Sequence, residues 1–311
     1  MRGITVKGWG VAVPEKVLTN EDLSVWLDTS DEWIVERTGI RERHIGGTTA
    51  GLSIESGQRA LRSAGVTAAD IDHLVLATTT PDATVPATSA TVQDGLGIVG
   101  GAFDVNAACS GFVYGLVVAA GLIASGAGRV LLVGTDTLSR ITDWEDRKIA
   151  VLVGDGSGAV VLEPVDGPGD LLSWNLNADG SLRNLLKCEL GGYLSMDGQE
   201  IFRKAVRLVV ESTERALADA GMTADDVDLL VPHQANLRII QAVCQRLGIE
   251  EERAAVVIDR YGNTSSASIP LALDHALRSG RIRPGARLLL AGFGGGMTWA
   301  SAVLRWGDGT G

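Results

Sequence analysis

Of the three cysteines in the chain, one stands where a thiol is able to react. Cys109 follows a short strand-like segment and precedes an apolar helical run to about Ala124, within the block Ala-Ala-Cys-Ser-Gly-Phe. A helix N-terminus favours a thiolate, because its free N–H groups and dipole stabilise negative charge. The competing interpretation is a buried structural cysteine, the commoner role of a lone cysteine. That interpretation fits Cys188 and Cys244.

A histidine and an asparagine are candidates to act with this thiol. His233 follows a buried apolar strand and a proline, and α/β proteins keep their sites beyond the carboxyl ends of strands. Asn263 lies in Gly-Asn-Thr-Ser, where small residues again lead into a helix. Its other interpretation is a turn residue or a helix N-cap.

The elements that must position these residues are duplicated. Residues 56–80 align without gaps on residues 212–236 at an offset of 156, with twelve of the 25 positions identical. Each copy predicts an amphipathic helix that stops at Ala-Gly, a Thr-x-x-Asp restart and an apolar strand. We therefore expect an α/β protein of two halves, residues 1–165 with Cys109 and residues 166–311 with His233 and Asn263.

The repeat also predicts a relation between two of the candidates. The helix ends at Ser125-Gly126 and Ser279-Gly280 correspond at an offset of 154, and the same offset relates Cys109 to Asn263. We expect these two residues to face each other across a pseudo-twofold axis.

Nearer the C-terminus, Gly292-Phe-Gly-Gly-Gly-Met297 lacks the helix that follows a dinucleotide fingerprint. It predicts a turn between strands, with N–H groups available to an oxyanion.

Composition excludes several classes of protein. Hydrophobic residues make up 45% of the 311, which is ample for a core. The net charge of −11 argues against a nucleic-acid partner, which needs a basic surface. No apolar run approaches the roughly 18 residues of a membrane span, and the N-terminus lacks a secretory signal. The cysteine spacing predicts neither a disulfide framework nor a metal site. We expect a cytoplasmic protein with no membrane partner.

Five motifs in order resemble the β-ketoacyl-acyl-carrier-protein synthase III family of the thiolase superfamily. The resemblance covers nearly the whole chain and implies a thiolase-like five-layered αβαβα fold made of two duplicated halves. It implies a homodimeric enzyme that condenses an acyl-CoA primer with malonyl-acyl-carrier protein to start fatty-acid synthesis, without a cofactor. The motifs are Thr29-Ser-Asp-Glu-Trp-Ile-Val-Glu-Arg-Thr-Gly-Ile-Arg-Glu-Arg-His-Ile45, the block around Cys109, Val231-Pro-His-Gln-Ala-Asn-Leu-Arg-Ile239, Gly262-Asn-Thr-Ser265 and Phe293-Gly-Gly-Gly296.

The same resemblance assigns roles to individual residues. Cys109 would accept the acyl group, and His233 and Asn263 would hydrogen-bond the thioester carbonyl of the malonyl unit. The backbone N–H groups of Cys109 and Gly295 would form the oxyanion hole. The adenine end of coenzyme A would be held by Trp33, Arg37 and Arg147. The carrier protein would dock on the segment formed by Gln234, Ala235, Asn236, Leu237 and Arg238, with Arg238 as the main contact.

This chain departs from the family pattern at several places. Val85 stands where similar short-chain enzymes often have a phenylalanine that caps the partner subunit's acyl pocket. Because valine is smaller, we expect a primer larger than acetyl, such as a branched or medium chain. The segment 181–197 is shorter than the usual loop over the active-site mouth. Gln245-Arg246 replaces a pair of lysines after the docking segment, and a basic set on one predicted helix is expected to compensate: Arg203, Lys204 and Arg207.

Other functions of the same fold stay open. One is a starter-unit ketosynthase of polyketide or secondary metabolism, and another is an acyltransferase that does not condense. The acyltransferase usually lacks the asparagine, so Asn263 counts against it. A non-catalytic partner subunit such as a chain-length factor would be expected to lose the nucleophile, which Cys109 retains.

Overall fold

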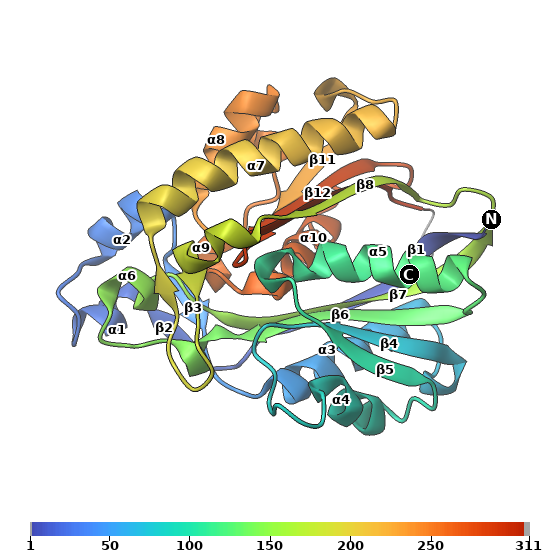
Figure 1. The fold of residues 1–311 in the computed structure, drawn as a ribbon, viewed down its shortest axis with the longest axis horizontal. Coiled ribbons are helices and arrows are strands. Elements are labelled where there is room, and N and C mark those ends of the chain that lie inside the picture. The colour runs from blue at the N-terminus through green and yellow to red at the C-terminus, as the bar shows by residue number, and fades with distance from the viewer. Residues whose placement is uncertain (1, 308–311) are drawn as a thin grey trace.

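Two mixed β-sheets form the frame of the molecule in the computed structural model, which describes residues 2–307 (Figure 1). In the first sheet β4 runs parallel to β5 and β6, while β1 and β7 run antiparallel to their neighbours. Its strands, in spatial order, are β1 (Arg2–Ala12), β7 (Asp155–Asp166), β6 (Arg129–Thr137), β4 (Ile71–Ala77) and β5 (Gly101–Val105). The second sheet consists of β11 (Leu229–Pro232), β12 (Arg287–Gly294), β13 (Thr298–Arg305) and β8 (Leu171–Ala178).

Helices fill three layers around these sheets, so that the molecule is a five-layered αβαβα sandwich (Figure 1). The middle layer packs against both sheets, and its helix α5 has no charged residue, as expected for a helix that lies between two sheets. The predicted fold class is therefore confirmed. The layers consist of α3 (Thr49–Ala64) with α4 (Thr88–Leu96), α5 (Gly111–Ala124) with α10 (Ser268–Arg278), and α7 (Gly198–Asp219) with α8 (Leu237–Leu247).

The sequence repeat corresponds to a repeated structural unit. Gly65 after α3 and Gly221 after α7 both adopt left-handed backbone, with φ of 67° and 68°. Each is followed by a Thr-x-x-Asp capping box and then by a buried parallel strand, β4 or β11. The order β4-β6-β7-β1 repeats as β11-β12-β13-β8 with the same parallel and antiparallel pairings. The boundary of the two halves at residue 165 stays a prediction.

The predicted equivalence of Cys109 and Asn263 is wrong. A short helical turn, Ala108–Ser110, precedes α5, and a matching turn, Ser265–Ala267, precedes α10 at an offset of 157. The first residue of each turn has a positive φ, 46° at Ala108 and 51° at Ser265, so the structural counterpart of Cys109 is Ser266. The predicted offset was set at the helix ends, and it fails at the beginnings because α10 has 11 residues where α5 has 14.

Excursions from both halves form a smaller unit beside the sheets, at the left of Figure 1. The buried Arg43 links the segments contributed by the first half: its Nη atoms donate to the carbonyls of Leu18 and Val151 and to Oδ1 of Asn20. Burial lowers the pKa of Arg43 to about 10.

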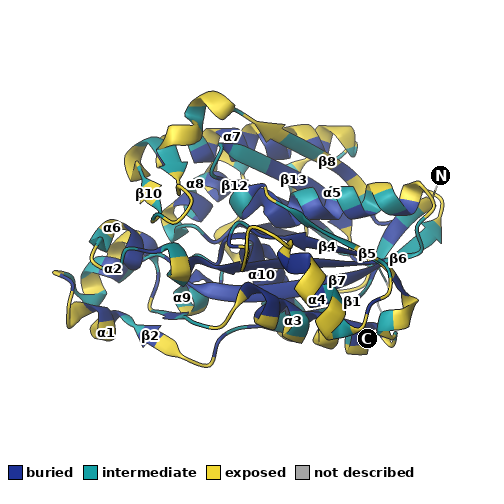
Figure 2. Cartoon of the chain, turned by 60° about the horizontal axis from the view of Figure 1, so that its bottom comes forward, coloured by how far each residue is buried: buried dark blue, intermediate teal, exposed yellow. Residues whose placement is uncertain are grey.

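Figure 2 shows the sheets as buried and the outer loops as exposed. The remaining elements are β2 (Val17–Thr19), α1 (Asn20–Ser24), α2 (Asp31–Thr38), β3 (Glu42–His44), α6 (Arg147–Ala150), β9 (Leu186–Lys187), β10 (Ser195–Met196) and α9 (Ile258–Tyr261).

None of the helices within residues 2–307 is both long and apolar enough to cross a membrane.

Candidate active site

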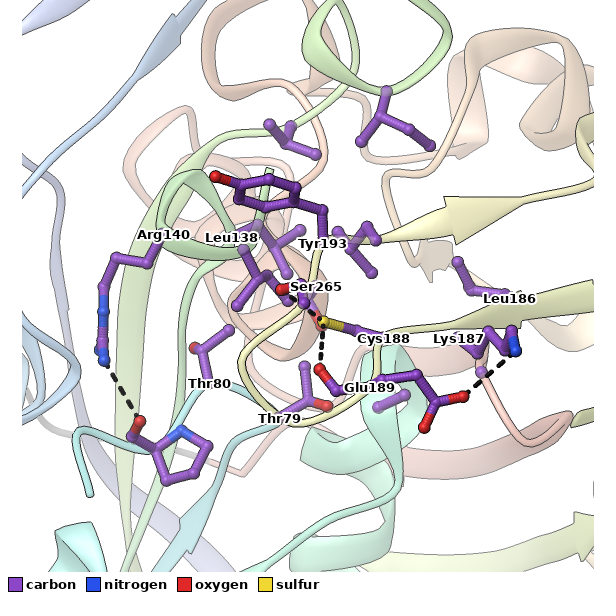
Figure 3. Close-up of a pocket in the computed structure, with 18 of the residues that line it drawn as sticks. Thr79, Thr80, Leu138, Arg140, Leu186, Lys187, Cys188, Glu189, Tyr193 and Ser265 are labelled. Carbon is purple, nitrogen blue, oxygen red and sulfur yellow. Dashed lines mark hydrogen bonds and ion pairs between the residues drawn. The ribbon is translucent and has the colours of Figure 1, made fainter. Parts of the chain in front are cut away.

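The carboxyl ends of several strands converge on one cavity of about 750 Å³. Its lining includes Asn106 directly after β5, Leu138 after β6 and Gly295 after β12, together with Cys109 and Asn263. Loops from both halves thus build a single site where parallel strands end, as is usual in α/β proteins. Figure 3 shows the segment Leu186 to Tyr193 passing over this cavity.

Cys109 lies at the turn that opens α5, and its backbone is closely covered by the end of β12. A Cβ on Gly294 would stand 2.5 Å from the Cys109 nitrogen, so this position accepts only glycine without displacement of the turn. The Cys109 side chain is buried, and burial raises the pKa of the thiol to about 12. The charge of Asp136 adds to that rise, while the hydroxyl of Ser265 opposes it. The thiol is therefore neutral near pH 7.

Asn263 is fixed at the cavity wall by three hydrogen bonds. Its backbone N–H donates to the carbonyl of Leu152 at 2.8 Å, and its own carbonyl accepts from the N–H of Gly154 at 2.8 Å. Its side-chain Oδ1 accepts the backbone N–H of Ser265 at 2.9 Å. Since the oxygen is engaged within the protein, the amide N–H groups are the atoms that Asn263 has to offer a ligand.

His233 follows β11 and is buried, but it is not among the residues that line the cavity. Its backbone N–H donates to the carbonyl of Ala291 at 2.7 Å, and its ring packs edge-on against Phe293 with centroids 5.4 Å apart. Phe293 stands between two glycines, Gly292 and Gly294, that both pack against the backbone of Cys109. Burial lowers the pKa of His233 to about 3, so the imidazole is neutral near pH 7.

Asp136, at the end of β6, joins the two halves beneath the cavity. Its Oδ1 accepts hydrogen bonds from the segment Thr78–Thr80 after β4. Its Oδ2 accepts the backbone N–H of Ser266 at 3.0 Å and the Ser266 hydroxyl at 2.5 Å. This buried carboxylate fixes the turn that carries Asn263 and Ser265 relative to the turn that carries Cys109. Nothing in the sequence patterns singled it out, because its partners come from both halves.

Comparisons with known proteins show which family the chain belongs to. Residues 103–180 match the family described as 3-Oxoacyl-[acyl-carrier-protein (ACP)] synthase III, and residues 217–306 match its C-terminal counterpart. The chain is 52% identical to a beta-ketoacyl-[acyl-carrier-protein] synthase III of Roseiflexus castenholzii, over 98% of each sequence. The chain belongs to the β-ketoacyl-acyl-carrier-protein synthase III family. Its recognition from five motifs is confirmed.

Solved structures of family members have the same fold. The 3-oxoacyl-(acyl carrier protein) synthase III of Pseudomonas aeruginosa superposes with a TM-score of 0.96 at 44% identity, covering 100% of both chains. The enzyme of Aquifex aeolicus gives a TM-score of 0.95 at 44% identity, covering 97% of this chain and 100% of that one.

In this family member the residues predicted to hold coenzyme A lie together outside the cavity. The guanidinium of Arg37 lies 4.5 Å and that of Arg147 4.8 Å from the centroid of the Trp33 ring, so both cations contact the indole. A neighbouring cleft is lined by Arg37, Arg203 and Arg238. Arg203 from α7 thus joins the predicted docking segment.

Within that docking segment, Gln234 points inward. Its side chain donates to the carbonyls of Pro232 and Ala255 and accepts the N–H of Val257. Gln234 is buried, whereas Arg238 is exposed and donates to the carbonyl of Glu36 at 2.9 Å. The segment therefore reaches the surface from Ala235 onward.

The positions of Val85, Cys188 and Cys244 can each be compared with what the sequence predicted. Val85 is 85% exposed and is not among the residues that line the cavity, so its predicted role depends on a partner subunit. Cys188 is not a buried structural cysteine: it is exposed on the loop over the cavity, with Sγ 3.3 Å from the carbonyl of Gly192 (Figure 3). Cys244 is fully buried in α8, as predicted. No group of three or more His, Cys, Asp or Glu within residues 2–307 is arranged to hold a metal ion.

Proposed function

We propose that this chain is a β-ketoacyl-acyl-carrier-protein synthase III that transfers an acyl group from coenzyme A to Cys109 and condenses it with malonyl-acyl-carrier protein. The observation that carries the proposal is the single cavity lined by Cys109, Asn263 and Gly295. A nucleophile, an amide donor and a backbone N–H meet there in an apolar setting, which strengthens each electrostatic interaction.

In the first half-reaction the Cys109 sulfur attacks the acyl-CoA thioester. A new C–S bond forms, the bond to coenzyme A breaks, and coenzyme A leaves as a thiol with the proton that Cys109 gives up. The N-terminus of α5 favours negative charge on this sulfur. The backbone N–H groups of Cys109 and Gly295 are the proposed donors to the oxyanion of the tetrahedral intermediate.

In the second half-reaction the malonyl thioester loses carbon dioxide and becomes an enolate. Its carbon attacks the Cys109 thioester, and the sulfur leaves as a thiolate. The enolate oxygen needs hydrogen-bond donors rather than a base, since decarboxylation removes the need to abstract a proton. We assign this role to the amide N–H groups of Asn263, which lines the cavity, and to the neutral imidazole of His233, which lies behind the cavity lining.

The surface outside the cavity suits two acidic partners. We assign Trp33, Arg37 and Arg147 to the adenine end of coenzyme A, because a base can stack on the indole and a guanidinium attracts phosphate. We assign the cleft with Arg203 and Arg238 to the acyl-carrier protein, an acidic protein. The net charge of −11 repels such partners elsewhere, so this local basic patch would direct their approach.

The primer and the assembly are linked proposals. The cavity of about 750 Å³ has an apolar wall that includes Leu138, Ile141 and Met196, which supports an acyl group larger than acetyl. The first sheet ends at β5, whose outer edge carries no strand within the described chain. We propose a homodimer across this edge, with Val85 reaching the partner's cavity. Turnover of acetyl-, isobutyryl- and octanoyl-CoA tests the primer, and a strong preference for acetyl would overturn it. Light scattering tests the dimer.

Intact-mass measurement after incubation with acyl-CoA tests the central proposal. The wild type should gain one acyl group, and Cys109→Ala should gain none. Cys188→Ala is the matched control, because it removes the other thiol that lines the same cavity and should leave acylation unchanged. Malonyl-acyl-carrier protein should then convert the adduct to product, and Asn263→Ala should slow that step. An adduct on Cys188, or none, would overturn the proposal; an adduct that never condenses would indicate an acyltransferase.

A further inference from the structure

Ser265 places a hydroxyl in the cavity wall without a hydrogen-bond partner in the described chain. The residue is 1% exposed, it lines the cavity, and its Oγ neither donates nor accepts within residues 2–307. A buried polar group without a partner is uncommon in native proteins and calls for an explanation, such as contact with a ligand or a reacting group.

The backbone at Ser265 is strained and is held in that state from both sides. Its φ of 51° lies in the left-handed region, which side-chain-bearing residues seldom adopt. Its N–H donates to Oδ1 of Asn263 at 2.9 Å, and the next residue, Ser266, is bound to Asp136 through backbone and side chain. Strain of this kind persists where the surrounding structure over-determines it, and it clusters at functional sites.

The Cys109 thiol lines the same cavity as this hydroxyl, and the hydroxyl lowers the pKa of that thiol. The turns that begin with Ala108 and Ser265 contact each other across the pseudo-twofold axis. Among the influences on the pKa of Cys109, the Ser265 hydroxyl is the strongest that favours the thiolate. Burial and the charge of Asp136 act in the opposite direction, so the thiolate needs a donor close by.

We propose that Ser265 is a further catalytic residue, whose hydroxyl donates a hydrogen bond to the Cys109 sulfur whenever that sulfur carries negative charge. Such charge arises twice, when the thiolate attacks the acyl-CoA and when condensation releases it. This inference rests on the proposed function, because it takes Cys109 as the acyl acceptor. The Asp136 carboxylate is a positioning group for Ser265, since it binds the adjacent Ser266.

Ser265→Ala removes the hydroxyl and little else. Alanine keeps the backbone N–H that Asn263 accepts, and it meets the same backbone strain as serine because both carry a Cβ. Ser89→Ala is the matched control: Ser89 also has a buried hydroxyl without a partner in the described chain, but it lies on α4 and does not line the cavity. Ser265→Gly removes the hydroxyl and relieves the positive φ, so it gives a second variant in case the alanine form folds poorly.

Alkylation by iodoacetamide measures the Cys109 thiolate directly. The sulfur forms a bond to carbon, iodide leaves, and the thiol proton goes to solvent. Peptide mapping separates Cys109 from the exposed Cys188. If Ser265 stabilises the thiolate, both Ser265 variants should alkylate at Cys109 roughly tenfold more slowly at neutral pH, because each unit by which a thiol's pKa rises lowers the thiolate fraction tenfold. Ser89→Ala should react at the wild-type rate.

Two results would overturn the inference: alkylation of Ser265→Ala at the wild-type rate, or an equal slowing in Ser89→Ala.

A parallel single-turnover acylation with acyl-CoA separates this inference from the proposed function. Slow alkylation in the Ser265 variants, with no acylation even of the wild type, would leave Ser265 beside a reactive thiol and refute the synthase. Normal acylation and alkylation of Ser265→Ala would leave the synthase intact and refute the role of Ser265.

Discussion

The buried neutral imidazole of His233 should make the protein sensitive to acid, and replacing it should remove part of that sensitivity. Burial lowers the pKa of His233 from 6.5 to about 3. Below pH 6.5 the unfolded chain therefore binds a proton that the folded chain does not, so stability falls as the pH falls from 6.5 toward 3. At pH 5 the loss is about 2 kcal/mol, since each pH unit below the unfolded pKa costs about 1.4 kcal/mol.

His233→Gln isolates this effect, because glutamine does not titrate. The quantity to measure is the free energy of unfolding by urea, at pH 7 and at pH 5, for wild type and variant. All other titrating groups are common to both proteins, so the wild type should lose about 2 kcal/mol more than the variant between these two values. His73→Gln on β4, where the imidazole is only partly buried, controls for loss of a histidine as such. Equal losses in wild type and His233→Gln would refute the reasoning.

Three further predictions concern the elements around the cavity. Ser266→Ala should lower the free energy of unfolding by about 1–3 kcal/mol, because the buried carboxylate of Asp136 loses a donor; an unchanged urea midpoint would contradict this. Gly294→Ala should slow acylation by on the order of a hundredfold, since the new Cβ would displace the Cys109 turn, and single-turnover acylation at the wild-type rate would exclude that contact. Arg238→Glu should raise the KM for malonyl-acyl-carrier protein several-fold and leave acylation by acyl-CoA unchanged; equal effects on both half-reactions would argue against docking there.

The architecture was predictable because both copies of the repeat carry their signals locally. The Ala-Gly stop and the Thr-x-x-Asp restart at 67–70 and 223–226 are capping chemistry that sequence displays directly. The turn between β12 and β13 was also predictable, since alternation resumes after the glycines. Such features depend on neighbours in the chain, which a reader of the sequence sees.

What the sequence could not predict depends on contacts between distant segments. The hydrogen bonds of Asp136 join residues from both halves, and the positive φ of Ser265 lies in the turn that these bonds hold. No spacing of residues along the chain encodes either feature. The exposure of Cys188 follows from how its loop passes over the cavity. The pairing of Cys109 with Asn263 failed because helix length differs between the halves, and a constant offset takes no account of such a deletion.

The counterpart of the nucleophile at Ser266 shows what duplication allowed this chain to do. Two equivalent turns arose, but a single chemical centre needs only one attacking atom. In the second copy this position is Ser266, whose hydroxyl binds Asp136 and the carbonyl of Ala77. The second turn thereby supports the turn that carries Cys109. Neither half can then be exchanged for a second copy of the other: one carries the reactive atom, and the other supplies the support on which its placement depends.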